Sequence, residues 1–263
     1  MANGIQAGFQ FNFFRNLIVR QIRQDYLENL TGFAWLILQP LVLLGVYAFV
    51  FTQIFKARVT GLEELGFVPY LAVAFWPWTA FSEAILKASH SITEHAALIG
   101  KVAFASEQLP LATVTATFMM HMIGYLAVLI VLQITGTHIL WQYVIYLLPV
   151  LLLLWGLACA IALFASASQV FVRDIAQILP PLMTFWFFTT PILYSKSYVP
   201  EKLARVLDWN PLTWYVERIR GILLFDQVRF GWHDLAMLLT VPVLFWLSLR
   251  YFRRFSGHFE DFI

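Results

Sequence analysis

The chain has 263 residues, of which 60% are hydrophobic and only 12% are charged, and its mean hydropathy is +0.74. These values exclude an ordinary soluble domain and indicate an integral membrane protein. The formal net charge of +2 is too small to indicate a nucleic-acid-binding protein, so no nucleic-acid partner is expected.

The first expected element is an amphipathic helix over residues 9–30. Its apolar positions recur near helical spacing, at Phe9, Phe13, Leu17 and Ile18. The arginines take other faces, at Arg15, Arg20 and Arg23. This pattern favours a helix in the headgroup region, although a solvated leader remains an alternative. The apolar run that follows is too long for a signal-peptide core, so it is expected to remain in the mature protein.

Windows without charge predict an all-α membrane protein with about six spanning helices in a single domain, 1–263. The expected spans are 32–55, 67–89, 109–133, 140–167, 175–195 and 233–252. The run 108–172 lacks Asp, Glu, Lys and Arg, and its polar segment 133–138 supplies the turn of a transmembrane hairpin. An even number of spans places both termini on one side, and the basic residues near both ends predict that this side is cytoplasmic.

Ionisable groups are rare inside these spans. His121 is the deep candidate, and the sequence favours an interhelical hydrogen bond over a proton relay because no acid lies near it along the chain. Glu83 and Lys87 have the i,i+4 spacing and the favourable order of an ion pair. Cys159, the single cysteine, lies in an apolar helix and is expected to be a packing residue. No metal or cofactor site is predicted in this chain.

The connection after the second span contains Ser91 and Glu94 at the spacing of a capping box. This predicts a helix of about two turns that stops at Gly100. The polar residues His95 and Lys101 accompany it. On the cytoplasmic side, such a helix could dock a partner or could simply join two spans.

The segment 196–232 before the last span predicts two short amphipathic helices. Pro200 begins the first, and Asn210 with Pro211 forms an N-cap with proline at N1 for the second. One face of the second helix is apolar, with Leu212, Val216, Ile219 and Leu223. The polar residues Glu217, Arg218 and Arg220 are expected off this face. The pair could cover a pore exit or could be passive interfacial helices.

Aromatic residues make up 17% of the chain and occur at many depths of the predicted spans. Flat apolar rings with polar groups suit a path for a chain of sugars, because sugars have apolar C–H faces and hydroxyls. The candidate channel residues are Trp35, Tyr47, Phe185, Trp186, Phe187, Phe188 and Tyr194. For any single ring, packing against lipid or core is the alternative.

The chain has no phosphate-binding loop, because its Gly100-Lys101 pair is not followed by Ser or Thr and lacks the glycine that such a loop needs before it. No ATP site is therefore expected. Energy for uphill transport would have to come from a partner on the cytoplasmic face.

Five motifs in order resemble the permease subunits of ABC-2 polysaccharide exporters, which export O-antigen, capsule or teichoic acid. The motifs are Gly32-x-x-Trp35-x-x-x-Gln39-Pro40, 101–111 (KVAFASEQLPL), Val172-Arg-Asp-Ile175, Thr190-Pro-Ile-Leu-Tyr194 and Asn210-Pro-Leu-Thr-Trp-Tyr-Val-Glu-Arg-Ile-Arg220. The resemblance covers nearly the whole chain. The family commonly has proline where this chain has Ala105 or Ser106, so the loop before the third span could differ in shape.

The resemblance implies a homodimer with a pore at the two-fold axis, bound to two copies of a separate ATPase that holds ATP and Mg. It implies that the leading helix and the 91–100 helix contact this ATPase, through Arg15, Arg20, Arg23, Ser91, Glu94, His95 and Lys101. It also implies that the 196–232 helices shape a periplasmic gate, with Asn210, Pro211, Trp214, Val216, Glu217 and Arg220.

The sequence is therefore interpreted as a transport subunit, not an enzyme, that exports a lipid-linked polysaccharide through the bacterial inner membrane. An ABC-2 exporter of a drug or lipid is an alternative in the same class. A membrane-embedded glycosyl or acyl transferase is the alternative from another class, and the scarcity of acids in the spans argues against it.

Overall fold

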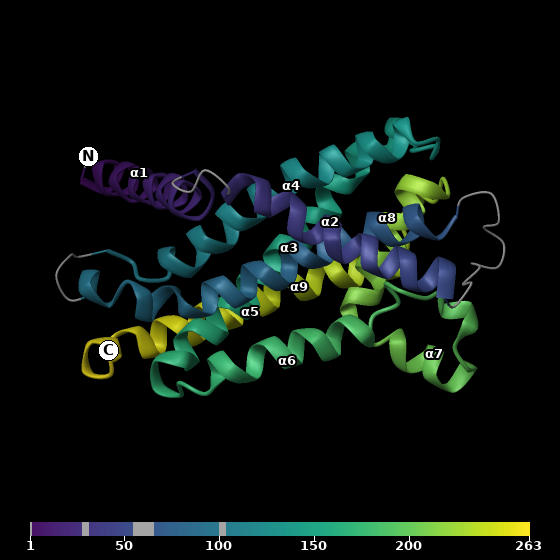
Figure 1. The fold of residues 1–263 in the computed structure, drawn as a ribbon. Helices are drawn as coiled ribbons and strands as arrows, with labels where there is room; N and C mark the ends of the chain where they lie inside the picture. Colours follow the sequence, from purple (N-terminus) through teal and green to yellow (C-terminus); the bar gives the residue numbers. More distant parts are fainter. Residues whose placement is uncertain (1, 28–31, 55–65, 100–103) are drawn as a thin grey trace.

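The computed structural model describes residues 2–27, 32–54, 66–99 and 104–263 (Figure 1). Over these ranges the chain is helical and has no β-strand, which confirms the predicted all-α class. The α-helices are α1 (Ala2–Ile22), α2 (Gly32–Phe49), α3 (Phe67–Glu94), α4 (Gln108–Ile134), α5 (Leu147–Phe171), α6 (Ile175–Phe188), α7 (Glu201–Leu207), α8 (Pro211–Leu224) and α9 (Trp232–Ser256). Short helical segments of one or two turns flank them, at Arg23–Leu27, Val50–Ile54, Ala96–Leu98, Trp141–Tyr146, Lys196–Tyr198 and Phe259–Asp261.

The charge-free run folds as the predicted hairpin of α4 and α5. Gly136 has φ +98° in the connecting turn, a conformation that L side chains rarely adopt. Oε1 of Gln133 accepts hydrogen bonds from the backbone N of Ile139 (3.0 Å) and from Nε1 of Trp141 (3.1 Å). The polar residues of the turn therefore satisfy backbone and side-chain donors at the end of the hairpin.

The core of the bundle lies between α3, α4 and α5. Small residues on α3 and α5 allow the helices to approach closely, as in other membrane bundles; on α3 they include Ala72, Ala80, Ala84 and Ala88. Trp76 of α3 is fully buried, and its Nε1 donates to the backbone O of His121 on α4 (2.9 Å). Helix α9 packs on the other side of α5, where Val241 approaches Gly156.

A second apolar cluster joins the N-terminal helix to the ends of several other helices. Its buried members are Leu17, Ile92, Leu109, Ala112, Leu163, Ala167, Val170, Phe252 and Phe259. Phe13, Phe14 and Ile18 of α1 pack against it, whereas Arg15, Arg20 and Arg23 are exposed. The N- and C-terminal ends lie at one end of the bundle and α7 lies at the other (Figure 1).

The prediction of a separate two-turn helix after the second span is wrong. Helix α3 continues through Ser91 to Glu94 because residues 78–94 contain no glycine or proline that would stop it. The hydroxyl of Ser91 donates to the backbone O of Ala88 (2.7 Å) and does not cap a new helix. Only the short 3₁₀ turn Ala96–Leu98 follows. The predicted stop at Gly100 lies outside the described residues.

The helix predicted over 175–195 is shorter than expected, because α6 ends at Phe188. Pro191 lacks a backbone donor and disfavours a helical conformation at Thr190. At ~1.5 Å per residue, α6 reaches ~21 Å, less than the ~30 Å of a hydrocarbon core. Among the described helices, Gln108–Ile134, Trp141–Phe171 and Trp232–Ser256 are long and apolar enough to cross a membrane. The chain is thus a multi-pass membrane protein, whereas the number of six spans stays a prediction.

The segment before α9 contains both predicted short helices. Asn210 caps α8, since its Oδ1 accepts from the backbone N of Leu212 (3.0 Å), and Pro211 occupies the first turn. The predicted apolar face, Leu212, Val216, Ile219 and Leu223, is buried. Arg220, which was expected off this face, is buried too.

Candidate functional site

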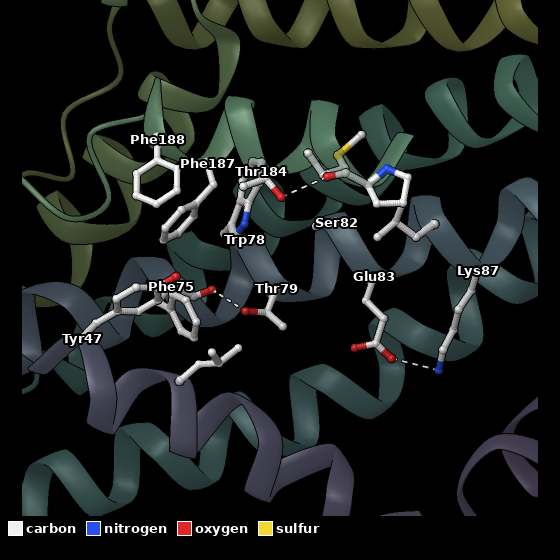
Figure 2. A pocket seen from close by; sticks show the side chains of 14 residues that line it. Tyr47, Phe75, Trp78, Thr79, Ser82, Glu83, Lys87, Thr184, Phe187 and Phe188 are labelled. Atoms are coloured by element: carbon white, nitrogen blue, oxygen red, sulfur yellow. Dashed lines mark hydrogen bonds and ion pairs between the residues drawn. The ribbon is translucent and has the colours of Figure 1, made fainter. Parts of the chain in front are cut away.

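An open cavity of about 530 Å³ lies between α2, α3 and α6 (Figure 2). This volume falls within the range of small-molecule sites. Helix α3 supplies one wall and α6 the other. On each helix the lining residues are spaced three or four positions apart, so they share one helix face. The lining residues are Leu43, Tyr47, Phe75, Trp78, Thr79, Ser82, Glu83, Leu86, Lys87, Pro180, Met183, Thr184, Phe187 and Phe188.

One end of the cavity is aromatic. Tyr47 stacks on Phe187, with ring centroids 5.7 Å apart, and Phe75 meets both rings edge to face. Phe188 contacts Phe187 in the same way (5.2 Å). In Figure 2 these rings lie at the opposite end from Glu83 and Lys87. Contacts of this kind fix the rings as rigid flat surfaces.

The hydroxyls along the wall are poised to accept hydrogen bonds. Thr79 donates its proton to the backbone O of Phe75 (3.0 Å), and Thr184 donates to the backbone O of Pro180 (3.0 Å). Each hydroxyl oxygen therefore keeps lone pairs for a ligand. The carboxylate of Glu83 adds further acceptors. The cavity thus suits a ligand that has hydroxyl donors together with apolar faces.

The polar end of the cavity belongs to a network across three elements. Lys87 Nζ contacts Glu83 Oε1 at 2.8 Å, which confirms the predicted ion pair, and it also contacts Oδ2 of Asp25 at 3.1 Å. Glu83 Oε2 lies 2.9 Å from Nε2 of the fully buried His121. Local sequence patterns do not reveal Asp25 as a partner of Lys87 or Glu83 as a partner of His121, because 62 and 38 residues separate these pairs.

His121 acts as an interhelical hydrogen-bonder, as predicted. A carboxylate only accepts, so Nε2 of His121 carries the shared proton. Nδ1 is buried and has no partner among the described residues.

The predicted channel residues divide into three groups. Tyr47, Phe187 and Phe188 line the cavity. Trp35 and Phe185 are exposed on their helices, at 55% and 68%. Trp186 and Tyr194 are half-buried and serve other contacts: Trp186 donates to Oδ1 of Asn210 (2.9 Å), and Tyr194 donates to the backbone O of Phe188 (3.2 Å). Phe75 and Trp78 join the cavity although the predicted set omitted them.

The residues predicted to contact an ATPase lie toward the end of the bundle that holds the termini. Arg15, Arg20, Arg23 and Glu94 are exposed, and His95 is half-buried with Nδ1 2.9 Å from the backbone O of Ser91. Ser91 is buried, so its side chain is covered by the chain itself. Lys101 lies outside the described residues.

The predicted gate residues lie on α8 and at its N-cap, and among them Asn210 and Arg220 make hydrogen bonds to other elements. Asn210 Nδ2 donates to Oγ1 of Thr190 (2.9 Å) and to the backbone O of Thr189 (3.2 Å). Its Oδ1 accepts from Trp186 and Leu212. The start of α8 is therefore fastened to the end of α6. Pro211 and Trp214 are half-buried, Val216 is buried and Glu217 is exposed.

The guanidinium of Arg220 donates to three backbone carbonyls, those of Tyr70 (2.9 Å), Pro191 (2.6 Å) and Ile192 (2.6 Å). It also lies 3.4 Å above the ring of Tyr70. Burial lowers the pKa of Arg220 to about 10, so the group remains charged at neutral pH. Arg220 thus joins α8 to α3 and to the segment after α6.

Comparison with known proteins places these features in context. Residues 12–224 match the family of ABC-2 type transporters. The chain is 25% identical over 250 residues to the O-antigen export system permease protein RfbA of Myxococcus xanthus, covering 94% of each chain. It is 22% identical over 259 residues to RfbA of Klebsiella pneumoniae, covering 93% of this chain and 94% of that protein. It is 24% identical over 243 residues to the polysialic acid transport protein KpsM of Escherichia coli, covering 89% and 90%.

Proposed function

The chain belongs to the ABC-2 type transporter family, and we propose that it is the channel-forming membrane subunit of an ATP-driven exporter of a lipid-linked polysaccharide. The similar proteins named above are an O-antigen export permease and a polysialic acid transport protein. Their similarity extends over 89–94% of this chain, which supports a related cargo for the whole molecule.

The cavity between α2, α3 and α6 is the observation that carries this proposal. A sugar offers apolar C–H faces, which suit the fixed rings of Tyr47, Phe75 and Phe187, and each stacking contact contributes on the order of 1 kcal/mol. Its hydroxyls can donate to Thr79, Thr184 and Glu83. Weak repeated contacts of this kind let a polymer advance without being trapped.

Energy for export comes from a separate subunit, because ABC-2 type membrane proteins work with an ATPase partner that holds ATP and Mg. We place two ATPase copies on a homodimer of this chain. The exposed residues Arg15, Arg20, Arg23 and Glu94 form the proposed docking surface, together with His95 and Lys101. Ser91 lies at the same end of α3, but its side chain is buried and does not belong to the proposed docking surface.

The proposed membrane is the bacterial inner membrane, with both termini in the cytoplasm. Arg250, Arg253 and Arg254 at the end of α9 and the arginines of α1 support this orientation by the positive-inside rule. The proposed periplasmic gate is then formed by α7 and α8 at the opposite end of the bundle (Figure 1). In this arrangement α8 shapes the exit of the channel.

The test is export by a reconstituted complex. The chain and its partner ATPase are placed in liposomes with a lipid-linked polysaccharide on the outside, and ATP-dependent entry of the polymer into the lumen is measured. An ATPase without its catalytic base serves as control. Entry that requires ATP and both subunits is expected, and no entry with an active, bound ATPase would refute the proposed cargo.

The two alternatives predict different outcomes in the same preparation. An exporter of a drug or lipid would move a fluorescent lipid but not the polymer. A membrane-embedded transferase would modify an acceptor lipid when the purified chain alone is given a nucleotide sugar or an acyl donor. The purified chain alone is expected to show neither ATP hydrolysis nor transfer.

A further inference from the structure

Lys87 is held by two carboxylates that belong to different parts of the molecule. Glu83 precedes it by one helical turn on α3, whereas Asp25 lies in the turn Arg23–Leu27 that follows α1. Asp25 is itself fixed, because its Oδ1 accepts from Nε2 of Gln21 in α1 (2.9 Å). The N-terminal segment is therefore tied to α3 by a charged contact.

The same chain of contacts continues to α4 through the cavity wall. Glu83 and Lys87 both line the cavity. One carboxylate oxygen of Glu83 contacts Lys87, and the other contacts the buried ring of His121 on α4. The backbone of His121 in turn receives the indole N–H of Trp76. Figure 2 shows the Glu83–Lys87 pair on the face of α3 that lines the cavity. A movement of Asp25 would thus act directly on a group that borders the cavity.

Stability alone does not explain this network. Charged side chains within a membrane bundle are unfavourable, and partly exposed ion pairs stabilise proteins little. The side chains of Lys87 and Glu83 are 32% and 33% exposed. The N-terminal helix already has an apolar attachment through Leu17 and its neighbours. The network instead supplies a directional contact between a surface helix and the cavity.

We propose that Lys87 is a positioning residue for export. It couples the position of α1 and the turn Arg23–Leu27, relative to α3, to the shape of the cavity. This inference rests on the proposed function, in which the exposed arginines of α1 and the following turn receive the ATPase. When the ATPase moves that segment, the Asp25–Lys87 contact transmits the displacement to α3, and Glu83 shifts with it.

The charges predict the behaviour of variants. Lys87→Gln leaves two carboxylates without their shared cation, so Asp25 and Glu83 repel each other. The turn Arg23–Leu27 then loses its fixed position against α3. Asp25→Asn breaks the same link without this repulsion. The double variant Lys87→Gln with Asp25→Asn is therefore expected to lose no more coupling between ATP hydrolysis and export than Lys87→Gln alone. Lys87→Arg keeps a cation for both acids and is expected to preserve coupling.

The measurement is the ratio of polysaccharide exported to ATP hydrolysed in liposomes, with co-purification of the ATPase and the melting temperature of the complex recorded for each variant. Lys87→Gln is expected to lower the ratio at least about fivefold, the lower end of coupling between distinct sites, while the ATPase stays bound and active. Asp25→Asn lowers it less, and it keeps the test valid if Lys87→Gln fails to fold.

Arg253→Gln is the matched control. It removes another ion pair between two elements, Arg253 with Glu107 at 2.8 Å, and neither residue lines the cavity. An unchanged ratio in Lys87→Gln and Asp25→Asn, or an equal loss in Arg253→Gln, would overturn the inference. Failure of the proposed function is distinguishable, because the wild-type complex would then export no polysaccharide at all.

Discussion

The indole of Trp76 lies so close to Gly124 that a Cβ at this glycine would be 2.6 Å from Cζ2 of the ring. Real Cβ atoms do not approach so closely, so α3 or α4 would have to move. Because Trp76 is fully buried and hydrogen-bonded to the backbone of His121, the ring has no room to yield. The contact sets the distance between the two helices at the level of the polar network.

Gly124→Ala is therefore expected to destabilise the protein by about 1–3 kcal/mol, the usual effect of overpacking. Thermal unfolding in detergent would show a lowered melting temperature. Gly45→Ala is the matched control, since it lies in an apolar helix with nothing within 4 Å of its added Cβ. Equal melting temperatures for the two variants would contradict this account of the helix contact.

Replacing a ring in the cavity by leucine tests the stacking surface while keeping most of the apolar volume. Tyr47→Leu and Phe187→Leu are each expected to reduce export by roughly fivefold, since a lost stacking face corresponds to about 1 kcal/mol. Phe185→Leu on the same helix is the control, because this ring is 68% exposed and does not line the cavity. Export and the amount of each variant in the membrane would be measured together. Equal export by all three variants would assign the cavity rings to packing.

Arg220→Lys removes the forked donor that serves three carbonyls. A lysine ammonium cannot match the planar geometry, so at least one buried carbonyl loses its partner, and a loss of ~2 kcal/mol is expected. Arg205→Lys on α7 is the control, because that side chain is 71% exposed. Protease cleavage between α6 and α8 would report the loosening of the segment. Similar cleavage of both variants would argue against Arg220 as the attachment of α8.

Asn210→Ala removes the N-cap of α8, which by itself costs about 1 kcal/mol, and it leaves Nε1 of Trp186 without its acceptor. If α8 shapes a closed exit, the resting protein should leak small solutes. Asn210→Asp keeps the Oδ1 acceptor and should leak less. Efflux of a dye from liposomes would be compared with that of Trp209→Ala, a neighbouring residue that is 88% exposed. A tight Asn210→Ala variant would mean that the exit is sealed elsewhere.

Local patterns were sufficient for several parts of this molecule. The uncharged run 108–172 predicted the α4–α5 hairpin because a long apolar segment has few stable alternatives in a membrane. Asn210 with Pro211 predicted the start of α8, since an N-cap depends only on neighbouring backbone donors. The spacing of Glu83 and Lys87 likewise predicted their ion pair.

Local patterns misled where a neighbouring element decided the outcome. Ser91 and Glu94 matched a capping box, but nothing before them stopped α3, so the serine bonded back into its own helix. Arg220 was expected off the apolar face of α8, and its local pattern did not indicate that it is buried. The carbonyls of Tyr70, Pro191 and Ile192, all far from it in sequence, provide its buried partners.

The sequence by itself determined that this is a helical membrane protein with an amphipathic first helix, a central hairpin and two short helices before the last span, the second of them capped by Asn210. Hydrophobicity, charge and capping act over a few residues, so a local pattern is enough to predict them. Only the tertiary structure decided which rings face the cavity and which acids reach Lys87 and His121. Aromatic residues on one helix look alike in sequence, and a carboxylate finds a distant partner only when packing brings two helices within hydrogen-bond distance.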